Sequence, residues 1–181
     1  MRHWRGFTIL ELMITLVVLG ILTALADPSF SKMIARNNLS AASNDLVVAL
    51  LTARSEAVKR ERYVTLCPSS NGNDCIADDT QREEGYIGFV DSNRDKERNV
   101  GEQEIIRHEV SSKLDIVVAG GIDAAVTYGP EGRAYLLDGA NADFFTLTLD
   151  GQTKVVCLTL FGRPYIPDTP PNTPQSGADC T

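Results

Sequence analysis

An apolar segment at residues 7–26 constrains the fold of this chain more than any other part of the sequence. It reads FTILELMITLVVLGILTALA, and about 20 residues of this character are enough to cross the hydrocarbon core of a bilayer as one helix. Arg2, His3 and Arg5 precede it, so the positive-inside rule places the N-terminus in the cytoplasm. Everything after Pro28 is then expected on the opposite side of the membrane.

Glu11 is the one ionisable residue inside this segment. A carboxylate in the hydrocarbon of a bilayer costs several kcal/mol even by the lower estimates, so such a residue needs a partner charge. The segment contains no Lys, Arg or His, and the partner must therefore come from outside it. Glu11 is a candidate functional residue for this reason.

Two simpler interpretations compete for the same segment. A secretory signal peptide has a similar basic start and apolar core, and Ala24-Leu25-Ala26 ahead of Asp27 offers a cleavage site. The glutamate near the front and the length of the apolar run both disfavour it. The other alternative is a plain single-span anchor that happens to contain a glutamate.

Residues 6–12, GFTILEL, followed by the unbroken apolar run, resemble the class III leader of type IV pilins and type II secretion pseudopilins. The resemblance implies that a prepilin peptidase cuts after Gly6 and methylates the new N-terminal amine of Phe7. Glu11 is then the fifth residue of the mature chain, where the family has a glutamate that meets the N-terminal amine of a neighbouring subunit during assembly. Pro28 stands where the family has its helix-kinking proline.

Composition narrows the class of protein further. The chain has 181 residues, of which 43% are hydrophobic, enough for a membrane helix and one globular core. The formal net charge is −7, and loss of residues 1–6 removes two arginines, which leaves 15 Lys and Arg against 24 acids, or −9. This acidic balance argues against non-specific binding to nucleic acid or to anionic lipid.

The helix is expected to continue past Pro28, which would bend it. No Gly or Pro occurs from residue 29 to 61, and apolar residues recur there at helical spacing. They are Phe30, Met33, Ile34, Leu39, Leu46, Leu50, Ala53 and Ala57. We therefore predict one long helix, hydrophobic all round over residues 7–28 and amphipathic over residues 29–61, which packs on a domain formed by residues 62–181.

From residue 62 the pattern changes to strands separated by turn residues. Asp150-Gly151 is a two-residue hairpin signal. The predicted strands are 63–67, 86–91, 104–110, 114–119, 125–128, 134–137, 144–149 and 154–161. A long helix followed by such strands predicts an α+β fold, with the helix packed on an antiparallel β-sheet domain.

Three stretches of this domain resemble the GspH/FimT group of pilins more loosely: residues 84–110, 127–135 and 158–165. The resemblance implies a minor pilin, a structural subunit of a type IV pilus-like filament that acts in pilus assembly or initiation. It also implies an inner-membrane anchor, a periplasmic domain, and other pilins and the assembly machinery as partners. The alternatives are a type II secretion pseudopilin and a DNA-binding pilin of natural transformation.

Four cysteines lie at positions 67, 75, 157 and 180, all on the translocated side. An even number in an oxidising compartment suggests disulfides, and four cysteines allow three pairings. We predict Cys67–Cys75 and Cys157–Cys180, because each pair closes a loop of turn-forming residues beside a strand. A zinc site is a weak rival, since no CxxC spacing exists.

Oxygen-bearing side chains in residues 91–102 follow the spacing of an EF-hand calcium loop. They are Asp91, Asn93, Asp95, Glu97, Asn99 and Glu102. Position 6 of such a loop needs glycine and is Lys96 here, and the flanks read as strands. Calcium is therefore the one cofactor to test, and the alternative is a solvated connection between two strands.

Binding of DNA is disfavoured. Pilins that bind DNA carry a Gly-Arg-x-Arg run, whereas Gly162-Arg163 is followed here by Pro164 and Tyr165. No Lys or Arg follows Arg163, while a DNA-binding protein should offer several phosphate contacts. The chain ends in a proline-rich tail, which favours extended backbone over helix or central strand.

Enzymatic activity has little support in the sequence. There is no nucleophile elbow, phosphate-binding loop or set of metal ligands typical of an enzyme. His108 lies in a strand pattern with no evident nucleophile, so we expect it to be structural or exposed.

Overall fold

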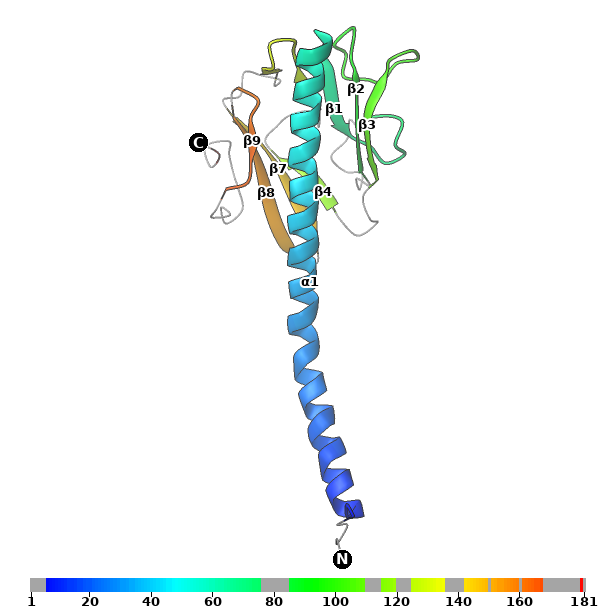
Figure 1. Cartoon of the computed structure of the whole chain (residues 1–181), viewed down its shortest axis with the longest axis vertical. Helices are drawn as coiled ribbons and strands as arrows, with labels where there is room; N and C mark the ends of the chain where they lie inside the picture. Colours follow the sequence, from blue (N-terminus) through cyan, green and yellow to red (C-terminus); the bar gives the residue numbers. More distant parts are fainter. Residues whose placement is uncertain are drawn as a thin grey trace, which may run out of the picture.

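The computed structural model describes residues 6–75, 85–109, 115–119, 125–135, 142–149, 151–159, 161–167 and 180. One long helix, α1 (Ile9–Arg60), projects from a β-rich domain (Figure 1). The strands are β1 (Val64–Pro68), β2 (Gly85–Val90), β3 (Glu104–Glu109), β4 (Asp115–Ala119), β5 (Val126–Tyr128), β6 (Ala134–Tyr135), β7 (Ala142–Leu149), β8 (Gln152–Thr159) and β9 (Pro164–Tyr165).

Helix α1 is capped at both ends. Thr8 is extended (φ −83°, ψ 152°), and its hydroxyl accepts a hydrogen bond from the backbone N–H of Glu11 at 3.2 Å. Thr8 and Glu11 have the spacing of a capping box. The helix ends after Arg60 because Glu61 is left-handed (φ 52°, ψ 38°). The backbone N–H of Glu61 bonds the carbonyls of Ala57 and Val58, and the N–H of Arg62 bonds that of Ala57.

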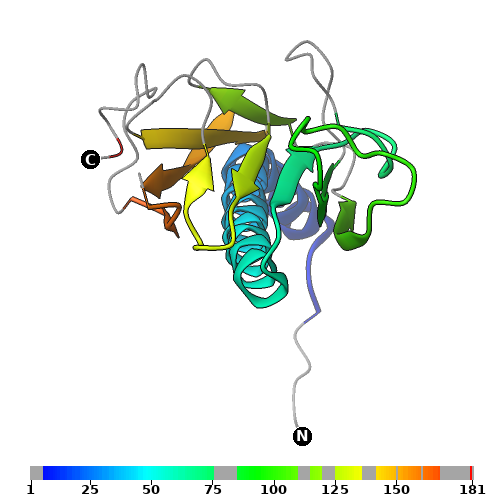
Figure 2. The same ribbon diagram turned by 90° about the horizontal axis from the view of Figure 1, so that it is seen from above.

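The upper half of α1 carries a stripe of buried side chains that face the domain. They recur every three or four residues and are Ala35, Leu39, Ser43, Leu46, Ala49, Leu50, Ala53 and Ala57. Both sheets lie on the same side of the helix (Figure 2). The lower members of the predicted apolar stripe behave differently: Met33 and Ile34 are exposed, because they precede the contact with the domain.

The strands form two antiparallel sheets. One has the order β3-β2-β1-β5-β6 and the other the order β4-β7-β8-β9. The predicted helix packed on antiparallel strands is confirmed, whereas their division into two sheets was not predicted. The pairing of Leu149 with Gln152 joins β7 to β8 through a two-residue loop, at the place where Asp150-Gly151 predicts a hairpin.

Each predicted strand is present with its ends within two residues of the prediction. The short strand β9 was not predicted, since proline usually interrupts sheet pairing. Pro164 is tolerated because β9 lies at the edge of its sheet, where it pairs with Leu158 of β8.

One cluster of buried side chains joins α1 to both sheets. Leu50 and Ala53 of the helix contribute to it, as do Tyr128 of the first sheet and Leu147 and Val156 of the second. All five are fully buried. Burial of apolar area on this scale is the main favourable term in folding, so helix and sheets form one cooperative core.

The four cysteines form two disulfides, Cys67–Cys75 and Cys157–Cys180, which are the predicted pairs. No cysteine is free, so the zinc alternative is excluded. The first bridge closes a short loop onto β1, and the second fixes Cys180 against β8. Most of the proline-rich tail, residues 168–179, lies outside the described residues.

Gly162 lets the two sheets approach each other closely. The Tyr128 hydroxyl of the first sheet donates a hydrogen bond to the carbonyl of Gly162 at 3.1 Å. Gly162 has φ 73°, and a Cβ atom there would lie 2.8 Å from both Ala134 N and Tyr128 Cε1. Both the backbone angle and the contact therefore require glycine.

Substitution of Gly162 by alanine should destabilise the chain more than the same change at Gly151. Gly151 has a similar φ of 71°, but a Cβ atom placed there would have no neighbour within 4 Å. Gly151→Ala therefore measures the cost of the backbone angle alone. We expect Gly151→Ala to lose about 1–2 kcal/mol and Gly162→Ala about 1–3 kcal/mol more from overpacking. Denaturant unfolding of the full chain in detergent measures the free energy of unfolding of both variants. Equal losses would show that the sheets do not pack tightly at Gly162.

Candidate functional site

The first described residues, 6–8, precede helix α1. Gly6 and Phe7 precede the helix, and the Phe7 side chain is 79% exposed. Thr8 caps the helix, which places Glu11 in its first turn. A carboxylate near a helix N-terminus is favoured by the helix dipole. The Thr8 cap was missed by the sequence analysis, although the T-x-x-E spacing signals it.

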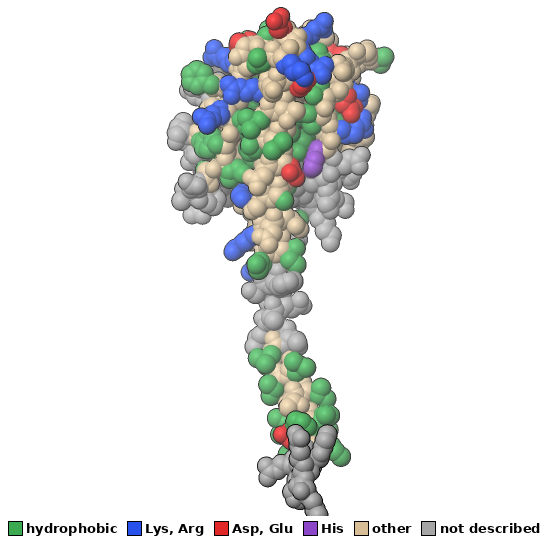
Figure 3. All heavy atoms as spheres, in the orientation of Figure 1, with side chains coloured by type: hydrophobic (Ala, Val, Ile, Leu, Met, Phe, Trp, Pro, Cys, Tyr) green, Lys and Arg blue, Asp and Glu red, His purple; other side chains and the backbone are tan. Residues whose placement is uncertain are grey.

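Apolar side chains are exposed on every side of the lower half of α1, which stands clear of the domain (Figure 3). They are Ile9, Leu10, Leu12, Met13, Ile14, Leu16, Val17, Val18, Leu19, Ile21 and Leu22. A surface of this kind is a liability in water and requires lipid or other protein around it.

Within the described residues, no helical stretch combines the length and apolar character needed to span a bilayer.

Helix α1 continues through Pro28. The side chain of this residue lies outside the described part of the chain, and the predicted kink stays a prediction.

Asp91, the first residue of the predicted calcium loop, is fully buried. Its Oδ1 accepts a hydrogen bond from the backbone N–H of Arg94 at 2.6 Å. Its Oδ2 accepts one from the N–H of Lys96 at 3.1 Å and one from the Thr65 hydroxyl at 2.8 Å. Because Thr65 gives its one proton to Asp91, the Thr127 hydroxyl donates to Thr65 at 2.8 Å. The carboxylate thus anchors the loop to strands β1 and β5.

The other oxygen-bearing residues of the loop are bonded among themselves. Asp95 accepts hydrogen bonds from the amides of Asn93 and Asn99, and Glu102 accepts one from the backbone N–H of Asn99. Hydrogen bonds from the Glu97 N–H and the Asn99 amide lower the pKa of Asp95 below its ordinary value. The described side chains hold no group of three or more His, Cys, Asp or Glu arranged to bind a metal ion. Calcium binding stays a prediction.

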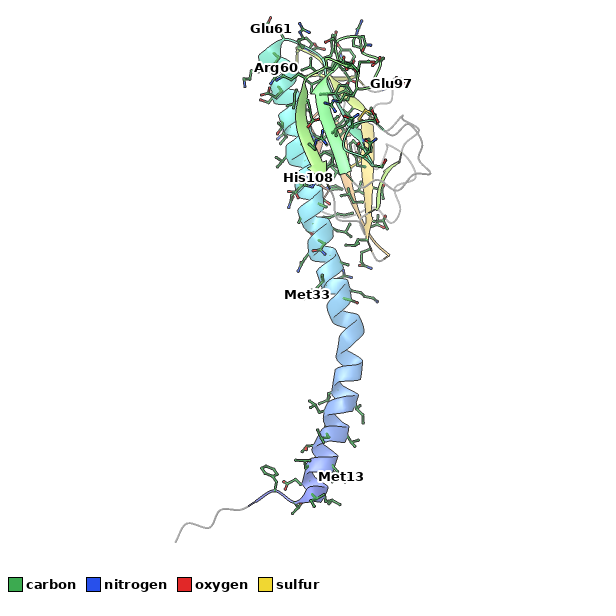
Figure 4. All side chains as sticks on the ribbon, turned by 90° about the vertical axis from the view of Figure 1, so that its right-hand side faces the viewer. Met13, Met33, Arg60, Glu61, Glu97 and His108 are labelled. Carbon is green, nitrogen blue, oxygen red and sulfur yellow. A yellow bond between two sulfur atoms is a disulfide. The ribbon has the colours of Figure 1, made fainter. Side chains whose placement is uncertain are left out.

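The basic residues of the loop contact groups outside it. The Arg94 guanidinium lies 4.9 Å from the centre of the Tyr63 ring, and Arg98 forms a 3.2 Å ion pair with Glu104. Glu97 lies at the end of the domain farthest from the N-terminus (Figure 4). Asp91 thus ties this connection between β2 and β3 to the domain, while most of the other residues of the connection are exposed.

The sequence analysis also considered His108 for catalysis and the Gly162-Arg163 pair for DNA binding, and His108 and Gly162 pack against other residues of the domain. His108 stacks on the Tyr86 ring at 4.8 Å between ring centroids, with an interplanar angle of 12°. Burial raises the pKa of Tyr86 well above its ordinary value. Gly162 serves the contact between the sheets, and Arg163 is exposed on the same turn.

Asp91→Ala should destabilise the domain even when calcium is chelated. The change leaves the buried Thr65 hydroxyl and two backbone N–H groups without their acceptor, which costs about 2–4 kcal/mol. Asp95→Ala is the matched control, because Asp95 is exposed and water can replace its hydrogen bonds, so the loss should be only about 0.5–1.5 kcal/mol.

Thermal unfolding of both variants with calcium and with chelator separates the two roles of the loop. If calcium binds here, it should raise the melting temperature of the wild type, and Asp95→Ala should abolish this increase. A loss for Asp91→Ala that appears only with calcium would contradict the hydrogen-bonded role of Asp91.

Comparisons with known proteins place these features in a family. The family model for type II transport protein GspH matches residues 42–162, and that for the prokaryotic N-terminal methylation motif matches residues 1–26. The first covers α1 from Ala42 onward and strands β1 to β8. The second covers the apolar segment with Gly6, Phe7 and Glu11.

Among curated proteins, the chain is similar to pilins. It is 34% identical over 99 residues to the pilin-like protein PilA1 of Thermus thermophilus, covering 55% of this chain and 56% of that protein. It is 41% identical over 59 residues to the type IV major pilin protein PilA of Myxococcus xanthus, covering 33% and 27%. The chain thus spans about half the length, or less, of these relatives.

A solved structure shares the fold. The type IV minor pilin FimU of Pseudomonas aeruginosa superposes with a TM-score of 0.55 at 20% identity, over 78% of this chain and 96% of that one. The family and the fold are those of structural subunits and not of enzymes. The methylation motif and the family imply a membrane-anchored subunit with a periplasmic domain. Because the GspH match covers more than half of the 181 residues, the chain belongs to the GspH family of type IV pilin-like proteins.

Proposed function

We propose that this chain is a minor pilin, a structural subunit of a type IV pilus-like filament that takes part in pilus assembly and initiation. The observation that carries this proposal is the lower half of α1. It exposes apolar side chains all round, and it continues as the helix on which the domain is built. Such a subunit is stable only when its helix is surrounded by lipid or by the helices of other subunits.

Glu11 provides the assembly contact in this proposal. In a bundle of helices, away from lipid headgroups and water, an unpaired carboxylate would cost several kcal/mol. The segment from Phe7 to Leu22 supplies no cation. The amine of Phe7 on a neighbouring subunit is therefore the counter-charge, and it exists only after cleavage behind Gly6. Processing by a prepilin peptidase and assembly are linked in this way.

Before assembly, residues 7–28 would span the inner membrane once, with the N-terminus in the cytoplasm and the domain in the periplasm. The two disulfides support this location, because bonds of this kind persist in oxidising compartments. The inner-membrane pilus assembly machinery would then extract the subunit into the filament.

A pseudopilin of type II secretion is the second candidate, and the description of the matching family as a type II transport protein favours it. We place the role in a pilus ahead of the role in type II secretion because the curated relatives are pilins and fimbrial proteins. The subunits that co-purify with the tagged chain, pilins or secretion components, separate the two candidates.

The mature chain should begin at N-methyl-Phe7. Intact-mass measurement of protein purified from membranes checks the mass of residues 7–181 with one methyl group and two disulfides. The Gly6→Ala variant serves as the control and should stay uncut. A mature start at Asp27 would contradict the pilin processing and support a secretory signal peptide.

Glu11→Ala should leave the subunit stable, processed and membrane-bound but poorly recruited into filaments. The Thr8 cap survives this change, because the hydroxyl bonds the backbone N–H of residue 11 and not its side chain. Glu11→Asp should also be impaired, since the shorter side chain holds the carboxylate back from the amine. The measurement is the ratio of this subunit in sheared filaments to that in membranes.

Thr8→Val is the matched control for this experiment. It removes the cap, at a cost of about 1 kcal/mol in helix stability, but it keeps the carboxylate. Thr8→Val should therefore be recruited much better than Glu11→Ala. Equal recruitment of wild type and Glu11→Ala would mean that Glu11 is not the assembly contact.

A further inference from the structure

A groove of about 660 Å³ lies between α1 and the second sheet, at the end of the domain nearest the N-terminal half of the helix. Its volume falls within the range of about 300–1,000 Å³ that is typical of ligand sites. Arg36, Ser40, Gln152 and Lys154 supply its polar wall, and Leu39 and Ile166 belong to its apolar wall. Basic side chains gather beside α1 at this end of the domain (Figure 3).

Arg36 and Lys154 each donate one side-chain hydrogen bond within the groove and keep further donors that could bind a ligand. Arg36 Nε donates to Gln152 Oε1 at 3.0 Å, which holds the guanidinium at the mouth of the groove. Its two terminal nitrogens have no partner among the described residues. Lys154 Nζ donates to Ser40 Oγ at 2.9 Å and keeps two further protons. A guanidinium beside an ammonium group is a favourable arrangement for a phosphate.

Among the described residues that line the groove, none is acidic. This is unusual in a chain of net charge −7. The overall charge disfavours non-specific attraction to anionic surfaces. A groove with two cations acts locally, however, and its direct contacts suit a single anionic group.

The position of the groove along α1 points to the source of that anion. Lys32 and Arg36 follow Pro28 by four and eight residues, which corresponds to about 6 and 12 Å of helix. The headgroup region extends roughly 5–8 Å beyond the hydrocarbon on each side. Helical side chains tilt toward the N-terminus, so Arg36 reaches back toward the headgroups, and Lys32 lies on the same helix face.

We propose that this groove binds the phosphate of an anionic phospholipid in the periplasmic leaflet while the subunit is anchored in the membrane. Arg36 and Lys154 bind the phosphate oxygens, Ser40 and Gln152 hold the two cations in place, and the apolar wall accommodates the start of the lipid tails. The inference rests on the membrane-anchored state in the proposed function. It adds a lipid site that positions the domain on the membrane surface.

The test uses the full mature chain in detergent micelles, with bound phosphatidylglycerol counted by native mass spectrometry across a lipid titration. The Arg36→Gln/Lys154→Gln double variant should bind phosphatidylglycerol at least about tenfold more weakly, because it removes both cations that form charge-assisted hydrogen bonds to the phosphate. Lys59→Gln/Arg133→Gln removes the same charge away from the groove and should bind like the wild type. Gln152→Glu, which adds a carboxylate at the groove without removing either cation, should also weaken binding.

Each further result decides the proposal. Equal binding by the groove variant and its control would overturn it, as would equal retention of phosphatidylcholine by the wild type. Inorganic phosphate that competes at the same concentration as the lipid would identify a free-phosphate site instead. A groove variant that binds lipid normally but is not recruited into filaments would assign the groove to a neighbouring subunit. Glu11→Ala should keep lipid binding, so a failure of the filament role and a failure of the lipid site can be told apart.

Discussion

The packing of the buried stripe of α1 against two sheets is the contact on which the rest of the molecule depends. Alanines at positions 49, 53 and 57 bring the helix backbone close to the strands, while Leu39, Leu46 and Leu50 fill the space between them. Because both sheets share this one core, neither is expected to be stable without the helix. Gly162 adds a second contact between the sheets, and Asp91 ties the long connection after β2 to the same framework.

Helix α1 packs against the domain in its C-terminal half and stands clear of the domain in its N-terminal half, and the pattern of its apolar residues differs between the two halves. Over residues 35–57 a stripe of buried side chains faces the domain, whereas over residues 9–22 exposed apolar side chains point in every direction. Met33 and Ile34 lie at this transition and are exposed, although their spacing fits the stripe. A helix of this design keeps part of its apolar surface unsatisfied in the isolated subunit. Membrane anchoring and association with other pilin helices are two ways to cover one surface.

Much of this fold could be predicted from the sequence because its signals are local. Helical spacing, turn residues and strand alternation predicted α1 and strands β1 to β8 to within two residues, and loop composition indicated both disulfides. The division into two sheets was not predictable, because it depends on which strands pair and not on their periodicity. The role of Asp91 was missed for a related reason. Its spacing matches a calcium ligand, but its partner Thr65, and Thr127 that bonds Thr65 in turn, come from strands distant in the sequence. Lys96 adopts φ 63° at the position where such a loop needs glycine, and its N–H bonds Asp91.

Because α1 is continuous, the depths of Glu11 and of the basic groove in the membrane are coupled. Arg36 follows Glu11 by 25 residues, which corresponds to about 38 Å of helix. A bilayer with its headgroups is about 40–45 Å thick. On the proposed scheme, Glu11 therefore lies at the cytoplasmic interface when the groove lies at the periplasmic one, and each charged group meets headgroups or water. The proposed extraction into a filament would remove both from the bilayer together. On the proposed scheme, the amine of a neighbouring Phe7 compensates Glu11, whereas the groove must release its lipid or keep it. The free energy that holds the subunit in the membrane is thus divided between the two ends of one helix, and assembly has to replace the interactions at both.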